Sequence, residues 1–195
     1  MAYRIRPARN AAKEVRKAAL GRINKAIQAL CVEPSERAEG VHQARKRFKE
    51  LRALLRLVRE PLGARFSVDN RRLRDAGRRL AESRDAAAML ESWDALARTD
   101  QPLFVSDAFR QIRLRLQQRA APDGEVHTGF DVEVTQVLGD LRALTRDVQH
   151  WKLPGKGFGL LAAGFRRTYA DGVRDLARAQ KADSDELLHE WRKRV

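Results

Sequence analysis

The chain has 195 residues and a formal net charge of +14, with 43% hydrophobic and only 6% aromatic residues. This length and hydrophobic content suffice for one large domain or two small ones, and the excess of positive charge predicts an anionic partner. One cysteine, Cys31, excludes an intrachain disulfide and a cysteine-based zinc cluster, and no apolar run is long enough for a secretory signal or a membrane-spanning helix.

The first part of the chain predicts a bundle of four helices. Apolar residues three and four positions apart mark helices at about residues 8–30, 35–60, 69–96 and 103–120. In the last of these, we expect Ile112 to face inward and Arg113 outward. The Ala-Pro-Asp-Gly run at residues 121–124 predicts a domain boundary. It divides the chain into a first four-helix bundle over residues 1–121 and a partial second helical bundle over residues 122–195.

The second part also predicts helices. Residues 130–137, FDVEVTQV, alternate apolar and polar side chains as a short strand would, but residues 138–151 continue with helical spacing. One isolated strand has no pairing partner, so we expect this whole segment to be helical and, as the least basic helix, to lie away from an anion site. Further helices are expected at residues 158–180 and 183–195, which completes an all-α fold of antiparallel helical bundles.

Residues 41–59 carry two stripes at helical spacing. The apolar stripe consists of Val41, Ala44, Phe48, Leu51, Leu55 and Val58. The cationic stripe consists of His42, Arg45, Lys49, Arg52, Arg56 and Arg59, shifted by one residue and therefore by about 100° around the helix. The cations are thus expected beside the surface on which the helix packs, with Lys46 adding charge near its start.

This cationic stripe is unfavourable for an isolated helix. Like charges at this spacing destabilise a helix by roughly 0.2–0.5 kcal/mol per pair, so the stripe costs on the order of 1–2 kcal/mol. A long anion lying along the stripe would turn this repulsion into binding energy. A solvated basic face is the alternative interpretation.

The cationic motif occurs twice. Residues 42–48 read HQARKRF and residues 189–195 read HEWRKRV, so the histidine and the Arg-Lys-Arg run correspond position by position. Such a repeat predicts two related halves. Two of these helices facing each other across a pseudo-two-fold axis would line one groove with cations.

The pattern from His42 to Arg52, in which a histidine precedes spaced Arg, Lys, Leu and Arg residues, resembles the signature of the CHAD domain, a conserved histidine α-helical domain. Residues 84–85, 151–161 and 165–179 are similar to later elements of that family. The resemblance implies two four-helix bundles related by pseudo-two-fold symmetry. It also implies inorganic polyphosphate as the ligand, held by basic residues that line a central groove or pore.

Carried over to this sequence, the implied binding positions are His42, Arg45, Lys46, Lys49, Arg52 and Arg56 in the first half and His189, Arg192 and Lys193 in the second. Cations on the flanking helices join them as candidates: Lys13, Arg16, Arg167 and Arg174. The chain stops at Val195, one or two turns into the second motif, so we expect the second bundle to be incomplete.

Other functions compete with polyphosphate binding. Nucleic acid would use the same cations, although the stripe lacks interleaved aromatic residues for base stacking. A helical scaffold that receives an acidic protein or an anionic membrane surface is a further alternative. We expect no enzymatic activity, cofactor or metal, because no Gly-rich phosphate loop, HExxH or CxxC motif occurs. We expect a cytoplasmic protein that associates with polyphosphate granules, binds sulfate or phosphate at the same site, and is able to form oligomers.

Overall fold

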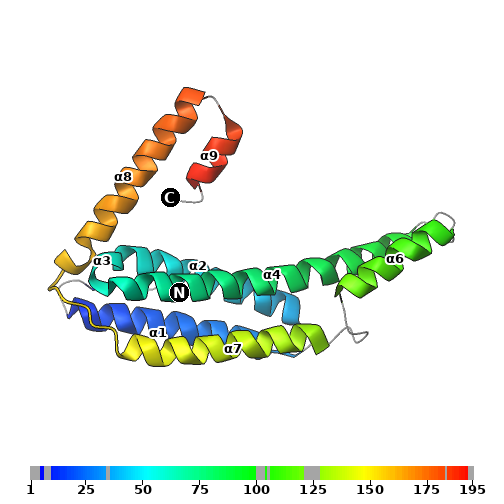
Figure 1. Cartoon of the computed structure of the whole chain (residues 1–195), viewed down its shortest axis with the longest axis horizontal. Helices are drawn as coiled ribbons and strands as arrows, with labels where there is room; N and C mark the ends of the chain where they lie inside the picture. The colour runs from blue at the N-terminus through cyan, green and yellow to red at the C-terminus, as the bar shows by residue number, and fades with distance from the viewer. Residues whose placement is uncertain are drawn as a thin grey trace. The chain divides into compact units, whose positions relative to one another are not determined.

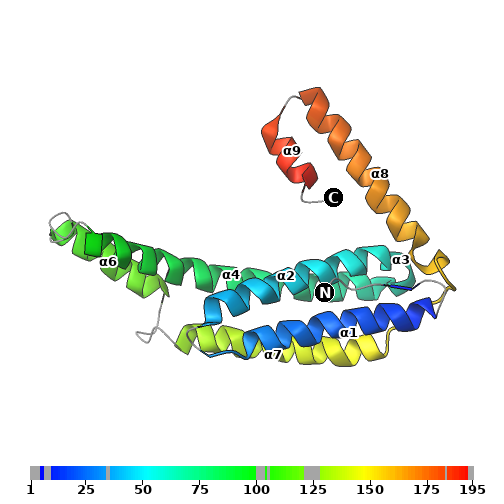
Figure 2. The same ribbon diagram turned by 180° about the vertical axis from the view of Figure 1, so that it is seen from behind.

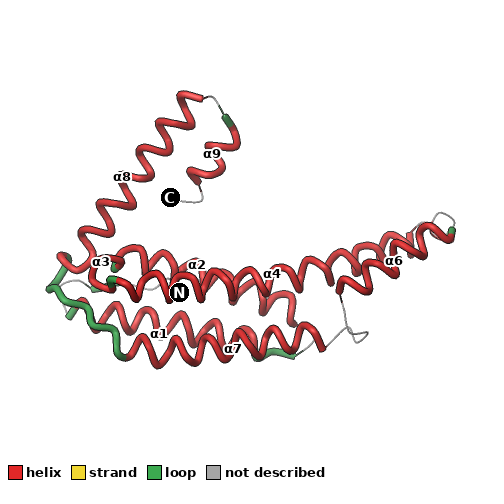
Figure 3. Tube along the Cα trace, viewed as in Figure 1, coloured by secondary structure: helices red, strands yellow, loops and turns green. Residues whose placement is uncertain are grey.

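The computed structural model describes residues 5–6, 10–33, 36–99, 104, 106–120, 128–182 and 184–192, without the side chains of residues 38, 82–88, 91, 119–120 and 128–131. These residues form helices and their connections, and no strand occurs among them (Figure 3). The predicted all-α fold is therefore confirmed. The helices, labelled in Figure 1, are α1 (Ala11–Leu30), α2 (Arg37–Leu57), α3 (Arg59–Leu62), α4 (Ala64–Thr99), α6 (Asp107–Ala120), α7 (Thr128–Gln149), α8 (Gly159–Ala182) and α9 (Asp185–Arg192).

Helix α7 shows which of the two sequence patterns in residues 130–151, strand-like alternation or helical spacing, the chain follows. The whole segment up to Gln149 is helical, as predicted, despite the strand-like alternation at its start. Val137, Leu141, Leu144 and Val148 recur at spacings of four, three and four, and each is at most 1% exposed. A continuous buried stripe of this kind needs a helix, whereas a lone strand would leave its backbone groups unpaired.

The corner between α2 and α4 is tighter than the sequence predicts. Helix α2 ends at Leu57, α3 forms one turn, and α4 already begins at Ala64. Pro61 is tolerated in α3 because the first turn of a helix needs no backbone N–H donor. Gly63 closes the turn with φ +56°, and its N–H bonds to the carbonyl oxygens of Arg59 and Glu60. The Pro-Leu-Gly run therefore makes a short corner instead of a loop.

The chain forms two compact units, and each gathers segments that are distant in sequence. Unit 1 consists of Met1–Arg22, Lys49–Arg71 and Thr145–Val195, and unit 2 of Ile23–Phe48 and Arg72–Leu144. Both contain segments of α1, α2, α4 and α7, which run side by side in Figure 1 and Figure 2. The sequence-based division into residues 1–121 and 122–195 instead cuts the chain once, at the Ala-Pro-Asp-Gly run of residues 121–124. That run lies outside the described residues.

Each unit has an apolar core built from these helices. In unit 1 the buried side chains include Val15, Ala19, Leu51, Leu54, Leu55, Val58, Leu62, Val148, Trp151, Leu153, Leu160 and Leu161. In unit 2 they include Ile23, Ala26, Leu30, Val41, Ala44, Phe48, Leu73, Ala76, Leu80, Val137, Leu141 and Leu144. Nearly all of them follow the three-and-four spacing of their helix, so the sequence pattern alone identifies the core. Among the described residues, we find no helix with both the length and the apolar character that crossing a membrane would need.

Asp69 is a buried carboxylate at the start of α4 in unit 1. Its side chain is fully buried and accepts hydrogen bonds from Trp151 Nε1 at 3.1 Å and from Arg65 Nε at 3.1 and 3.2 Å. Arg65 also pairs with Asp147 at the end of α7. Desolvation lowers the pKa of Arg65, but its contacts with Asp69 and Asp147 outweigh this effect and raise it. The network ties α4 to α7 and to the connector that leads to α8.

Replacing Asp69 by alanine is expected to lower the free energy of unfolding by about 2–4 kcal/mol, because the Trp151 indole N–H and the Arg65 guanidinium each lose a buried acceptor. Chemical denaturation measures this change. Asp75→Ala is the matched control on the same helix, where the carboxylate pairs with the exposed Arg74 at 2.9 Å. The control is expected to stay within about 0.5 kcal/mol of the wild type. Equal effects of the two variants would contradict a structural function of the Asp69 network.

In unit 2, α6 packs along α4 through an aromatic cluster and an ion pair. The rings of Trp93, Phe104 and Phe109 lie 4.9–5.5 Å apart. The predicted orientations of two α6 residues are wrong: Ile112 is 41% exposed, whereas Arg113 is half-buried and donates to Asp94 at 2.7 Å. This hydrogen bond lowers the pKa of Asp94. The apolar spacing of α6 predicts an apolar residue on the side that contacts α4. An arginine can occupy that side when it pairs with a carboxylate on the neighbouring helix.

Candidate anion-binding site

Helix α2 has the apolar and cationic sides that its sequence predicts. Its apolar side is buried, with each residue at most 2% exposed: Val41, Ala44, Phe48, Leu51 and Leu55. The neighbouring cations are exposed or half-buried, and we call them the α2 stripe: His42, Arg45, Lys46, Lys49, Arg52 and Arg56. The first three belong to unit 2 and the last three to unit 1, on one uninterrupted helix.

Most of the α2 stripe has no hydrogen-bond or ion-pair partner within the described part of the chain. Arg52 is the exception, because its Nε donates to Asn70 Oδ1 at 3.0 Å. Glu50, the one acidic residue between positions 41 and 59, pairs with Arg22 of α1 at 3.2 Å. Arginines on other helices contact carboxylates: Arg65, Arg79 and Arg113. The stripe therefore keeps donors available for an external anion.

In unit 1, helix α8 approaches the corner at the end of α2 very closely. A Cβ atom at Gly164 would stand only 2.2 Å from the carbonyl oxygen of Leu57. Glycine is therefore required at this position, and the contact lets the backbones of α8 and α2 touch. One turn further along α8, Arg167 Nη2 lies 2.6 Å from Glu60 Oε1 of α3. The close approach thus carries an α8 arginine to the end of the α2 stripe.

A cavity of about 220 Å³ lies at this corner, wholly within unit 1. Arg56, Arg59 and Phe66 line it from α2, α3 and α4, and Arg167, Thr168 and Asp171 line it from α8. The structure therefore brings together Arg56 and Arg167, two of the residues proposed from the sequence. Sequence reasoning did not select Arg59, Phe66 or Thr168 as site residues, although Arg59 continues the cationic spacing three residues after Arg56.

The cavity has an excess of positive charge. Arg56 is exposed and has no partner among the described residues, while Arg59 places its guanidinium 5.0 Å above the ring centre of Phe66. This cation–π contact orients Arg59 without neutralising it. Arg167 forms an ion pair with Glu60, and Asp171 forms one with Arg174 along α8. The remaining guanidinium N–H groups suit a phosphate, which accepts several charge-assisted hydrogen bonds at once.

The candidates on α1 differ from each other. Lys13 is exposed, and its ammonium group has no partner among the described residues. Arg16 is half-buried, and its Nη1 donates to the carbonyl oxygen of Trp151 at 3.0 Å. Arg16 therefore holds the connector between α7 and α8 and has less freedom to bind a ligand.

The candidates near the C-terminus that the structure describes are exposed: Arg174, His189 and Arg192. Arg174 pairs with Asp171 one turn earlier on α8. His189 and Arg192 lie on α9, which has no fully buried residue, and Lys193 lies outside the described residues. The structure places none of these residues in the lining of the Arg56–Arg167 cavity.

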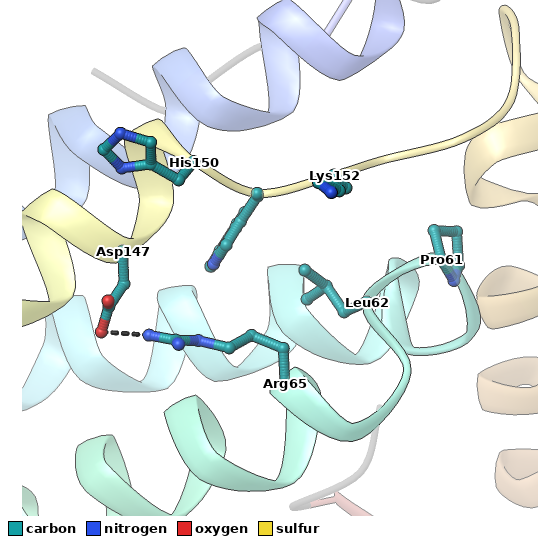
Figure 4. A pocket seen from close by; sticks show the side chains of 7 residues that line it. Pro61, Leu62, Arg65, Asp147, His150 and Lys152 are labelled. Atoms are coloured by element: carbon teal, nitrogen blue, oxygen red, sulfur yellow. Dashed lines mark ion pairs between the residues drawn. The ribbon is translucent and has the colours of Figure 1, made fainter.

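A second cavity in unit 1, of about 320 Å³, lies beside the Asp69 network (Figure 4). Arg65 and Asp147 point toward each other in it, and Leu62 and Lys152 lie nearby. Nδ1 of His150, also on this cavity, lies 2.8 Å from the carbonyl oxygen of Arg146. The charge of Arg65 is already balanced by two carboxylates, so this cavity suits an anion less well than the first.

In the part of the chain that the structure describes, no three His, Cys, Asp or Glu residues are grouped as metal ligands would be. The model of the CHAD domain family matches residues 8–195 of this chain. Comparison with curated proteins and with solved structures found no match.

Proposed function

Because this chain belongs to the CHAD domain family, we propose that it binds inorganic polyphosphate along the α2 stripe and releases it unchanged. The observation that carries this proposal is the row of cations without internal partners, which ends at the Arg56–Arg167 cavity. Successive cations on one helix side are about 5–6 Å apart, so a flexible anion can contact them in sequence. Arginines would bind phosphate oxygens in pairs, and lysines would act as point charges.

Binding without turnover is supported by the residue types of the α2 stripe. The stripe consists of Arg, Lys and one His, which bind and orient phosphates, and it contains no carboxylate to hold a divalent cation on them. His42 is exposed at one end of the stripe, where it can donate hydrogen bonds to phosphate oxygens when protonated. Free phosphate or sulfate would occupy the same positions more weakly.

Nucleic acid is the alternative ligand, and one observation favours it. Helix α8 exposes aromatic rings, among them Phe165 and Tyr169, and single-stranded nucleic acids stack bases on such rings. The aromatic residues beside the cations, by contrast, favour polyphosphate. Phe48 is 2% exposed, and Arg59 already covers the face of Phe66. A bare phosphate chain needs no stacking surface, so the stripe suits polyphosphate better.

A competition experiment separates these ligands. Labelled long-chain polyphosphate is bound to the protein at physiological salt and displaced by tRNA or duplex DNA at matched phosphate concentration. Both ligands gain the same electrostatic attraction to the cations. Nucleic acid also needs aromatic surfaces for base stacking, which the stripe lacks, so we expect it to compete poorly. Efficient displacement by nucleic acid, or no polyphosphate binding at all, would contradict the proposal.

A further inference from the structure

The carboxylate of Glu60 pairs with an arginine of the cationic cavity at the end of the α2 stripe. Its Oε1 is 2.6 Å from Nη2 of Arg167, which lines that cavity. Glu60 belongs to α3 and Arg167 to α8, so the ion pair joins two helices of unit 1. Both side chains are partly exposed, at 50% and 44%. A carboxylate of the chain itself therefore already contacts one arginine of the site that we assign to an external anion.

The arginines of this cavity come from both sides of the ion pair. Arg56 of α2, Arg59 of α3 and Arg167 of α8 line the cavity together, and like charges that share a cavity repel each other. The acidic residue in the lining, Asp171, pairs with an arginine of its own helix. Asp171 therefore does not join α8 to the corner. The carboxylate of Glu60 does, and it offsets the repulsion between Arg167 and the arginines of α2 and α3.

The side chain of Glu60 is suited to exchange with another anion. An exposed ion pair contributes little to stability because water screens it, so breaking the pair costs the fold little. The corner itself uses the backbone of Glu60, whose carbonyl oxygen accepts a hydrogen bond from the N–H of Gly63. A phosphate offers more oxygen acceptors than a carboxylate and can contact several guanidinium groups at once. A ligand phosphate can therefore replace the carboxylate on Arg167 and leave the corner intact.

We propose that Glu60 is a displaceable internal counterion of the anion site. Without ligand, its carboxylate pairs with Arg167 and holds α8 at the corner. With ligand, a phosphate takes its place and bridges Arg167 to Arg56 and Arg59. This exchange presupposes the proposed function, because it takes place at the same site.

The exchange favours polyanions over small anions. A singly charged anion gains little by replacing a carboxylate that the chain already holds beside Arg167. A polyanion gains more, because its neighbouring phosphates contact the α2 stripe at the same time and make the exchange an intramolecular step. Glu60 therefore makes the cavity selective for long anions.

The test replaces Glu60 by glutamine, which keeps the size of the side chain and removes its charge. In Glu60→Gln the ligand no longer competes with a carboxylate for Arg167. The variant is therefore expected to bind labelled long-chain polyphosphate about 3–5-fold more tightly than the wild type. Titration at physiological salt measures the affinity. If Glu60 only supported the fold, its replacement would leave binding unchanged or weaken it.

Asp107→Asn is the matched control. Asp107 of α6 is 95% exposed and pairs with the exposed Arg110 at 3.5 Å, so this variant also removes one negative charge and one arginine ion pair. Asp107 belongs to unit 2, whereas the cavity belongs to unit 1. Because salt screens exposed charges beyond about 10 Å, the control is expected to stay within about twofold of the wild-type affinity.

Hydrogen exchange shows whether Glu60 holds α8 in the ligand-free chain. Without ligand, we expect residues 159–171 to exchange faster in Glu60→Gln than in the wild type, because Arg167 then faces other arginines without a carboxylate partner. Polyphosphate is expected to restore slow exchange, since a phosphate replaces the missing carboxylate. Asp107→Asn is expected to exchange like the wild type in this segment.

The failure of the proposed function and the failure of this exchange give different results. A wild type that does not bind polyphosphate overturns both. If the wild type binds, two results overturn the exchange alone. One is Glu60→Gln binding no more tightly than Asp107→Asn, and the other is unchanged hydrogen exchange of residues 159–171 in ligand-free Glu60→Gln.

Discussion

Replacing Arg45, Lys49 and Arg56 together by alanine is expected to weaken polyphosphate binding by about 10²–10³-fold. None of the three side chains has a partner among the described residues, so their loss removes contacts with the ligand and costs the fold little. Arg52 is kept, because its hydrogen bond to Asn70 joins α2 to α4. Titration with labelled long-chain polyphosphate measures the affinity, and circular dichroism is expected to show unchanged helix content.

A second triple variant controls for net charge. Lys25, Arg115 and Arg142 are exposed residues of α1, α6 and α7, and replacing them by alanine removes the same three positive charges. Because screening limits the reach of exposed charges to about 10 Å, this variant is expected to lose at most about fivefold in affinity. If both triple variants weaken binding equally, polyphosphate responds to net charge and the α2 stripe is not its site.

The sequence predicts the helices of this chain well where one side of each is buried throughout. The spacing of Val137, Leu141, Leu144 and Val148 outweighs the strand-like start of α7, because about three turns of buried contacts count for more than a short alternation. Helix ends are less predictable. The corner at residues 58–63 depends on the φ angle of Gly63 and on the position of Pro61 in α3, and periodicity carries information about neither.

The candidate site was predictable only in part. The α2 stripe is a property of one helix, so the sequence identifies its members and its side. The cavity at its end depends on Arg167 meeting Glu60, residues 107 positions apart in the chain. That meeting depends in turn on the backbone contact between Gly164 and Leu57, and a glycine inside a helix gives no sequence signal for its neighbour. Local patterns therefore reveal the cations but not the pocket that gathers them.

Gly164→Ala is expected to lower the free energy of unfolding by about 1–3 kcal/mol and to weaken polyphosphate binding. The added Cβ would stand 2.2 Å from the carbonyl oxygen and 2.5 Å from the carbonyl carbon of Leu57, which are backbone atoms that cannot rotate away. Helix α8 must then move from the corner, and Arg167 separates from Glu60 and from Arg56. Chemical denaturation measures the stability, and the polyphosphate titration measures the loss of the pocket.

Gly139→Ala in α7 isolates the contact from helix propensity. Alanine is favoured over glycine in a helix by about 1 kcal/mol, and nothing lies within 4 Å of a Cβ atom at Gly139. This variant is therefore expected to stabilise the chain by up to about 1 kcal/mol and to bind polyphosphate normally. If Gly164→Ala destabilises the chain while Gly139→Ala stabilises it, the contact with Leu57 outweighs helix propensity at Gly164. If Gly164→Ala stabilises the chain as Gly139→Ala does, α8 does not rest on the α2 corner, and Arg167 has no place in the anion site.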